Sequence, residues 1–198
     1  MGSDHGPAVP VRGAVMAQRE LPTDVRIVLI GDEARIRELL AEEGADPAAF
    51  DIVPSQDDIT MSDNPTKAFQ AKPNSSINLG FQLTKAGKID AFASTGNTGA
   101  MLVGSIFILK PITGVLRPGI PTLVPKEGGG IGVLLDVGAN ADCKPDVLAQ
   151  FGLLGSLLAE HVYHVPTPKV ALLNIGEEEK KGDILRQATY ELMKEETQ

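Results

Sequence analysis

The chain of 198 residues has one cysteine, Cys143, so it cannot build an internal disulfide framework. Free thiols persist in reducing compartments, and we therefore expect a cytoplasmic location. The sequence also lacks a basic surplus, since its formal net charge is −8 at pH 7. An acidic chain is a poor general binder of nucleic acid, so nucleic acid is not expected among its partners.

Segments that would target or anchor the chain are also missing from the sequence. No basic start with a following apolar core marks a signal peptide. The apolar segment Ala100–Leu109 is too short to cross a bilayer. Metal-ligand spacings such as HxxxH and CxxC do not occur. We therefore expect a protein that needs no metal and no cofactor.

Short apolar runs alternate with helical patterns along the chain. Strands are expected over residues 25–30, 89–94, 122–124, 131–137 and 170–175. Helices are expected over residues 9–20, 33–43, 65–71, 77–86, 100–109, 145–163 and 183–194. This alternation predicts βαβ units and an α/β fold, with a mainly parallel sheet between two helical layers in a three-layer αβα arrangement. No linker interrupts the pattern, so residues 1–198 are expected to form a single α/β domain.

A small polar loop follows the apolar run that ends at Ser94. It consists of Ser94, Thr95, Gly96, Asn97, Thr98 and Gly99. An apolar helical pattern begins directly after it, so hydroxyls, an amide and flexible glycines would lie where a helix has unpaired N–H groups. Such a corner can hold an anion. The spacing matches neither the Walker loop nor the dinucleotide fingerprint, and an ordinary turn is the alternative.

A second strand-then-loop pattern begins at Ile131. Residues 131–140 have the pattern of a strand followed by small polar residues, and residues 141–145 lead into a long apolar helix. Ligands of open α/β sheets bind at the carboxyl ends of the strands. The two loops are therefore expected to line one crevice, although each alone can be a tight turn between a strand and a helix.

Three motifs together resemble the phosphate acyltransferase family: Gly2–Pro7, Ser94–Met101 and Leu135–Pro145. Shorter pieces agree at residues 30–32, 74–76, 116–118 and 173–178. The resemblance extends from residue 1 to about residue 193. It implies a fold like those of phosphotransacetylase and isocitrate dehydrogenase. It also implies an enzyme that moves a fatty acyl group from acyl carrier protein to inorganic phosphate, making acyl phosphate for phospholipid synthesis.

The resemblance carries further expectations about assembly and extent. It implies a cytoplasmic homodimer that can associate peripherally with a membrane. Compared with the family pattern, the first strand would precede Met1, and the pattern would continue beyond Gln198. The chain is therefore expected to be a fragment that lacks the first strand and the C-terminal part.

Phosphate attack on a thioester needs a held phosphate, donors for the developing oxyanion and a thiolate that can leave. A phosphate dianion is itself a nucleophile, so positioning and fixed donors supply the acceleration. The resemblance assigns phosphate or substrate binding to the Ser94–Gly99 loop, Arg117 and Asp4. It assigns catalysis to Lys144, Asp142, Asn140 and His5.

The residues of the second loop allow more than one role. Lys144 fits a cationic partner of phosphate or oxyanion, although its position also suits an ordinary surface lysine. Asp142 either orients Lys144 or caps the following helix. Asn140 fits a donor to the acyl carbonyl, and Asp136 fits a residue that only fixes the loop.

More than one role is also open for three other side chains. His5 is a proton-transfer candidate because its loop has a motif-like pattern. Arg117 either binds phosphate or forms a salt bridge. Cys143 suggests an acyl-cysteine intermediate, but no histidine is paired with it in the sequence, and free cysteines are commonly small buried hydrophobes.

Two other functions fit the same sequence. One is a short-chain phosphotransacetylase-like enzyme, which would differ in the size of its acyl pocket. The other is a non-catalytic module that binds an anion or a nucleotide. An activity assay of this chain, run beside a version that also has the missing first strand and the C-terminal part, would separate these functions.

Overall fold

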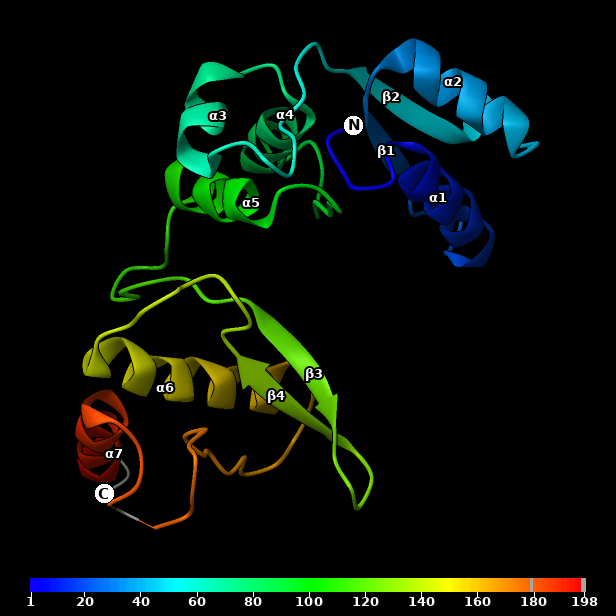
Figure 1. Ribbon diagram of the computed structural model, residues 1–198. Helices are drawn as coiled ribbons and strands as arrows, with labels where there is room; N and C mark the ends of the chain where they lie inside the picture. Colours follow the sequence, from blue (N-terminus) through cyan, green and yellow to red (C-terminus); the bar gives the residue numbers. More distant parts are fainter. Residues whose placement is uncertain (179, 197–198) are drawn as a thin grey trace. The chain divides into compact units, whose positions relative to one another are not determined.

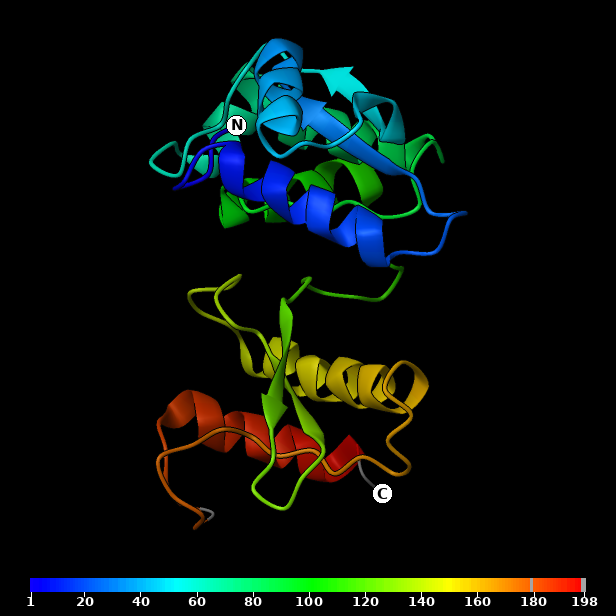
Figure 2. The ribbon, with the colours of Figure 1, turned by 90° about the vertical axis from the view of Figure 1, so that its right-hand side faces the viewer.

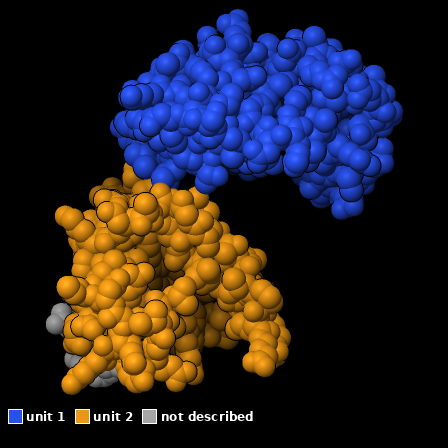
Figure 3. Space-filling view, in the orientation of Figure 1, with its two compact units in different colours: residues 1–110 blue, residues 111–198 orange. Residues whose placement is uncertain are grey.

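The computed structural model describes residues 1–178 and 180–196, and the chain divides into two compact units, Met1–Lys110 and Pro111–Gln198 (Figures 1 and 3). The elements of the first unit are α1 (Ala8–Glu20), β1 (Ile27–Gly31), α2 (Glu33–Glu42), the 3-10 turn η1 (Pro47–Ala49), β2 (Phe50–Pro54), α3 (Pro65–Ala71), α4 (Ser76–Lys85), α5 (Thr98–Gly104) and the π-helical turn η2 (Ser105–Leu109). Those of the second unit are β3 (Pro121–Pro125), β4 (Ile131–Leu135), α6 (Pro145–His161) and α7 (Ile184–Glu196). That the two units belong to a single domain stays a prediction.

The first unit contains a βαβ element. Strands β1 and β2 pair in parallel, from Ile27 opposite Phe50 to Gly31 opposite Pro54, and α2 forms the crossover. Asp32 caps α2, since its carboxylate accepts a hydrogen bond of 3.0 Å from the backbone N–H of Arg35. The sequence predicted βαβ units in general, but the second strand of this one, β2, was not among the predicted strands.

Two apolar cores hold the first unit. Figure 1 shows α1, α2 and the strand pair at one end of this unit, and α3, α4 and α5 at the other. The core beside the strand pair is formed by buried residues spaced three or four apart on α1 and α2, together with Phe50 of β2: Val11, Val15, Ile36, Leu39, Leu40 and Phe50. The core of the α3–α5 cluster is formed by Ile59, Ala68, Phe69, Ile77, Phe81 and Ala100.

The expected strand over residues 89–94 is wrong, because this stretch has no strand ladder in the structure. Its apolar character comes from packing on a helix instead. The ring of Phe92 meets that of Phe81 edge-on at a centroid distance of 5.3 Å. A Cβ on Gly80 would lie 2.4 Å from the Phe92 ring, so α4 approaches this segment closely. The apolar residue at position 92 therefore marks a helix contact, which periodicity alone does not distinguish from a strand.

The second unit contains an antiparallel hairpin. Strands β3 and β4 pair from Pro121 opposite Leu135 to Pro125 opposite Ile131. Helices α6 and α7 pack against each other, and Figure 2 shows them side by side. The strand expected over residues 170–175 is wrong, since this segment joins no ladder among the described residues. Leu173 and Ile175 are 77% and 87% exposed, so their apolar side chains pack on little of the unit.

All helices predicted from the sequence are present, with ends displaced by a few residues. The segment predicted as one helix over residues 100–109 begins at Thr98 and passes into the π-helical turn at Ser105. Within residues 1–178 and 180–196, no helix is long and apolar enough to span a membrane.

Candidate active site

The Ser94–Gly99 loop opens α5 through a side-chain cap. The Oδ1 atom of Asn97 accepts a hydrogen bond of 3.0 Å from the backbone N–H of Ala100. The hydroxyl of Ser94 accepts one of 3.1 Å from the N–H of Gly96, which tightens the turn before the cap. The loop therefore has the local structure expected for a helix start, but it follows an irregular segment rather than a strand.

The amide nitrogen of Asn97 ties this loop to a second one. It donates hydrogen bonds of 3.0 Å to the carbonyl of Thr60 and 3.2 Å to that of Asp63. Asn97 is only 5% exposed, so both ends of its side chain are used inside the protein. As a ligand donor, Asn97 would first have to break these bonds. The hydroxyl-bearing side chains of Ser94, Thr95 and Thr98 are exposed instead.

The Gly2–Pro7 segment lies against the same second loop. A Cβ on Gly2 would be 1.9 Å from the carbonyl oxygen of Ile59, so only glycine fits this approach. The next residues form a turn in which the Ser3 hydroxyl donates to the carbonyl of Gly6 at 2.8 Å. Asp4 and His5 are exposed on this turn. Through residues 59–63, the structure thus links the turn of Asp4 and His5 to the Asn97 loop.

Residues of this linking segment were missed by the sequence analysis. The ammonium group of Lys72 lies 2.7 Å from the Asp63 carboxylate and donates to the carbonyl of Asp58 at 2.6 Å. The hydrogen bond from Lys72 is the main cause that lowers the pKa of the Asp63 carboxyl. The carboxylate also accepts a bond of 2.8 Å from the N–H of Thr60. The only sequence signal nearby is the Asn74–Ser76 motif, where Ser75 caps α4.

In the second unit, the Asp136 carboxylate organises the loop after β4. It accepts hydrogen bonds from the backbone N–H groups of Ile120, Ala139 and Asn140 at 3.2, 3.0 and 2.8 Å. Burial alone would raise its pKa, but these bonds and one from the Asn140 side chain outweigh burial, and the pKa is lowered. Asp136 therefore fixes the loop as an ionised acceptor, as the sequence suggested.

Two further bonds join this loop to residues 116–118. The amide nitrogen of Asn140 donates to the carbonyl of Pro118 at 3.0 Å as well as to Asp136 at 2.9 Å. The guanidinium of Arg117 donates to the backbone carbonyl of Asp142 at 3.1 Å. Arg117 thus contacts the loop by a bond to a backbone carbonyl, and its role in binding phosphate stays a prediction.

The start of α6 differs from the expected cap. Lys144, not Asp142, is the residue before the first helical turn, and Pro145 occupies the first helical position. The carboxylate of Asp146 accepts a bond of 3.0 Å from its neighbour Val147. The alternative in which Asp142 caps the helix is therefore wrong. Asp142 and Lys144 are both exposed.

Cys143 has the environment of a weak nucleophile. Burial is the main cause that raises the pKa of its thiol, the negative charges of Asp136 and Asp142 raise it further, and Arg117 only partly opposes them. A thiol with a raised pKa supplies little thiolate near neutral pH. Within the described residues, no group of histidine, cysteine and carboxylate side chains could hold a metal ion.

Each unit thus gathers a set of the residues expected from the sequence. The first gathers Ser94, Thr95, Gly96, Asn97, Thr98 and Gly99 with Asp4 and His5. In the second, hydrogen bonds join Asn140 to Asp136 and Arg117 to Asp142, and Lys144 follows in the same loop. The roles of these residues in binding or catalysis stay predictions.

The chain is similar to known phosphate acyltransferases over most of its length. A phosphate acyltransferase of Desulforamulus reducens is 46% identical over 193 residues, which are 98% of this chain and 57% of the relative. One of Chlorobaculum tepidum is 44% identical over 195 residues, 98% of this chain and 59% of the relative. The chain thus spans less than two thirds of the length of these relatives.

The solved structure of EutD phosphotransacetylase from Staphylococcus aureus matches with a TM-score of 0.58 at 18% identity, over 96% of this chain and 60% of that one. At this identity the likeness shows the fold alone, and it confirms the α/β class. The sequence model described as "Fatty acid synthesis protein" matches residues 1–198. The chain therefore belongs to the fatty acid synthesis protein family.

Proposed function

We propose that this chain carries an acyl-phosphate-forming site, which transfers a fatty acyl group from acyl carrier protein to inorganic phosphate. The observation that carries the proposal is the similarity to proteins named phosphate acyltransferase over 98% of the chain. The motifs Ser94–Met101 and Leu135–Pro145 contain the two polar loops described above. The product would enter phospholipid synthesis.

The reaction needs no covalent intermediate on the protein. An oxygen of the phosphate dianion attacks the thioester carbonyl carbon, a C–O bond forms and the C–S bond breaks. The thiolate of the carrier's phosphopantetheine leaves and takes up a proton. The phosphate must be held against the carbonyl, and donors must meet the oxyanion of the tetrahedral intermediate.

In the first unit, phosphate binding is assigned to the exposed hydroxyls of Ser94, Thr95 and Thr98 and to the backbone of Gly96 and Gly99. Asn97 contributes by holding this loop, because its side chain is already bonded to Ala100, Thr60 and Asp63. Asp4 and His5 extend from the neighbouring turn, where His5 is the proton-transfer candidate.

In the second unit, Lys144 is assigned to the charge of phosphate or oxyanion. It is exposed and directly precedes α6, where backbone N–H groups also point outward. Asn140 is assigned to the carbonyl of the substrate, Arg117 to the phosphate and Asp142 to the orientation of Lys144. Asp136 positions Asn140 by a bond of 2.9 Å.

A short-chain phosphotransacetylase-like enzyme is the alternative acyl-phosphate former. Its support is weaker, since the likeness to EutD phosphotransacetylase has 18% identity and concerns the fold. The relatives at 44–46% identity are named phosphate acyltransferase instead. The homodimer, the cytoplasmic location and the peripheral contact with a membrane belong to the main proposal as its expectations.

The test is a chimera in which residues 1–198 replace the aligned part of the Desulforamulus reducens relative. The unmodified relative is the positive control, and the chimera carrying Lys144→Ala is the matched negative control. With long-chain acyl carrier protein and phosphate, the chimera is expected to form acyl phosphate, detected by mass spectrometry. A chimera that folds but forms none, beside an active relative, contradicts the proposal.

A further inference from the structure

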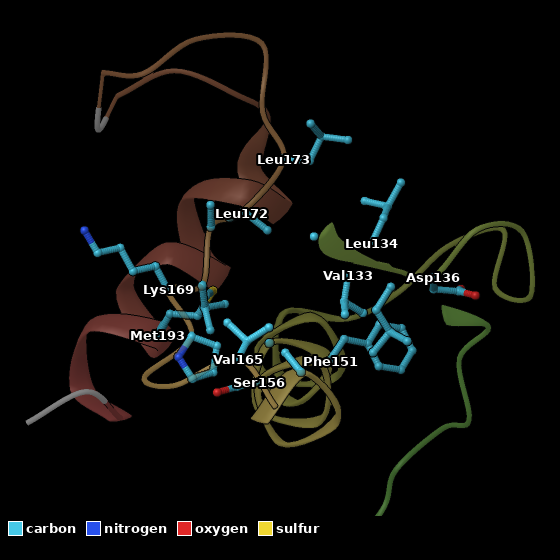
Figure 4. A pocket seen from close by; sticks show the side chains of 18 of the residues that line it. Val133, Leu134, Asp136, Phe151, Ser156, Val165, Lys169, Leu172, Leu173 and Met193 are labelled. Carbon is cyan, nitrogen blue, oxygen red and sulfur yellow. The ribbon is translucent and has the colours of Figure 1, made fainter. Parts of the chain in front are cut away.

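The second unit has an open cavity of about 900 Å³, whose lining includes the exposed residues Val137, Val170 and Leu173. This volume lies in the range of about 300–1,000 Å³ that is typical of small-molecule sites. Figure 4 shows its walls, which come from β4, α6, α7 and the segment Val165–Leu173. Most of the side chains are aliphatic or aromatic, among them Leu134, Phe151, Leu172 and Met193. The lining therefore suits hydrocarbon better than a polar ligand.

The buried polar side chains do not indicate a polar ligand. In the described part of the chain, every buried side-chain nitrogen or oxygen has a hydrogen-bond partner. The carboxylate of Asp136, which belongs to the lining, already accepts four hydrogen bonds. Because most of the lining is apolar, a ligand in the cavity would be held mainly by apolar contact, although Lys126, Lys169 and Arg186 also belong to the lining.

One end of the cavity is the polar loop of the candidate active site. Asp136 and Val137 at the carboxyl end of β4 belong to the lining, and so does Lys126 beyond the opposite end of that strand. On α6 the lining extends from Leu148 to Ala159, a length of roughly 16 Å at the helical rise per residue. Leu148 lies one turn after Lys144. The cavity is therefore elongated and begins at the loop that carries Lys144.

The face of α6 toward the cavity leaves open space at a glycine. A Cβ on Gly155 would meet no atom within 4 Å, whereas one on Gly152 would lie 3.2 Å from Val170 and 3.3 Å from Met193. Both glycines belong to the lining. A larger side chain at position 155 can therefore occupy the cavity without displacing protein atoms, which makes this position a direct probe of the space.

We propose that this cavity binds the long acyl chain of the substrate, with the acyl carbonyl at the Asp136–Lys144 loop and the tail toward Lys126. The inference rests on the proposed function, which supplies a substrate with a long hydrocarbon chain and a phosphate-bearing product. The elongated apolar lining fits the tail. Arg117 and Lys144, which belong to this loop but not to the cavity lining, are the cations to which we assign the negative end of an acyl phosphate.

Binding to the 198-residue chain tests the proposal without any activity assay. Alkyl phosphates of eight, ten and twelve carbons, kept below their micelle concentrations, are titrated by calorimetry. The Kd is expected to fall roughly fourfold for each added methylene, the equivalent of burying it. A Kd that does not depend on chain length, or no binding at all, overturns the proposal.

Two glycine variants locate the site. Gly155→Leu is expected to raise the Kd of dodecyl phosphate roughly fifteenfold, as if about two methylenes lost their contacts. Gly13→Leu is the matched control, because Gly13 is exposed on α1 and its Cβ would also meet nothing within 4 Å. It should leave the Kd unchanged, and both variants should keep the helical circular dichroism. Equal Kd values for Gly155→Leu and the parent chain overturn the proposal.

Two lysine variants test the orientation. Lys144→Ala should weaken binding of dodecyl phosphate but not of dodecanol, whereas Lys126→Ala should affect neither. The opposite pattern overturns the orientation. If Gly155→Leu instead converts a dimer to a monomer in gel filtration and no alkyl phosphate binds, the cavity is an interface between copies and the proposal fails. Failure of binding beside an active chimera refutes this inference alone, and binding beside an inactive chimera refutes only the proposed function.

Discussion

The side-chain amide of Asn140 donates a hydrogen bond of 2.9 Å to the carboxylate of Asp136, four residues earlier in the chain. The same amide donates to the carbonyl of Pro118. One ionised carboxylate and one amide thus join the loop after β4 to the segment before β3. This fixes the loop whose next residues are Asp142, Cys143 and Lys144.

Replacing Asp136 by alanine should destabilise the protein. The change removes an ionised acceptor and leaves three backbone N–H groups and the Asn140 amide without it. We expect a loss of about 3 kcal/mol in the free energy of unfolding, measured by urea titration with circular dichroism. Asp24→Ala, at an exposed position of the first unit, is the control. Equal unfolding midpoints for the two variants would show that the loop does not depend on Asp136.

The lowered pKa of Asp136 predicts a loss of stability in acid. Its carboxylate is favoured in the folded state, so this contribution is present above the unfolded pKa of about 3.9 and disappears as the pH falls through the lower folded value. Between pH 6 and pH 3, the stability difference between the parent and Asp136→Asn should shrink. Hydrogen exchange at the N–H groups of Ala139 and Asn140 provides the local readout. A difference that stays constant over this range contradicts the assignment.

Variants of Asn97 and Thr98 should separate the structural role of this loop from its role in phosphate binding. Asn97→Ala removes the cap of α5 and the bonds to Thr60 and Asp63, so the free energy of unfolding should fall by about 1–2 kcal/mol. Phosphate use by the chimera should weaken as well. Thr98→Ala, at an exposed site, should weaken phosphate use with little change in stability. If both variants keep the parent's phosphate dependence, the loop is only a turn.

Cys143 and Lys144 are adjacent, but they should behave differently. Cys143→Ser should keep most of the chimera's activity, since the raised pKa of the thiol disfavours a nucleophilic thiolate. Lys144→Ala should lower the rate roughly a hundredfold or more, the effect of losing one oriented donor. Initial rates of acyl phosphate formation are the measurement. The reverse order of effects, or an acyl group trapped on Cys143, would establish covalent catalysis.

The helices were predictable because their apolar residues recur at helical spacing and because capping residues directly precede some of them in the sequence. Asp32 and Ser75, for example, are followed by the helices that they cap. The strands were less predictable. Phe92 lies in an apolar run but packs on α4, and Phe50–Pro54 forms β2 although its pattern is short. Short apolar runs have the same appearance in a strand and in a helix contact.

The candidate site was predictable as loops but not as a network of bonds. The composition of Ser94–Gly99 indicates a helix start, and the structure has one there. Nothing local indicates that the Asn97 amide reaches Thr60, 37 residues away in the chain. The same holds for Arg117 and the carbonyl of Asp142, which are 25 residues apart. Such contacts depend on tertiary packing, which one sequence does not display.

The most direct test of the acyl transfer follows oxygen atoms. The chimera is supplied with acyl carrier protein that bears a long acyl chain and with inorganic phosphate in which all oxygens are ¹⁸O. The mass of the product is then measured by mass spectrometry. If phosphate itself attacks the thioester, the acyl phosphate keeps every labelled oxygen, including the one that bridges carbon and phosphorus. Release of unlabelled fatty acid without labelled acyl phosphate would contradict the account, because water and not phosphate would then be the nucleophile.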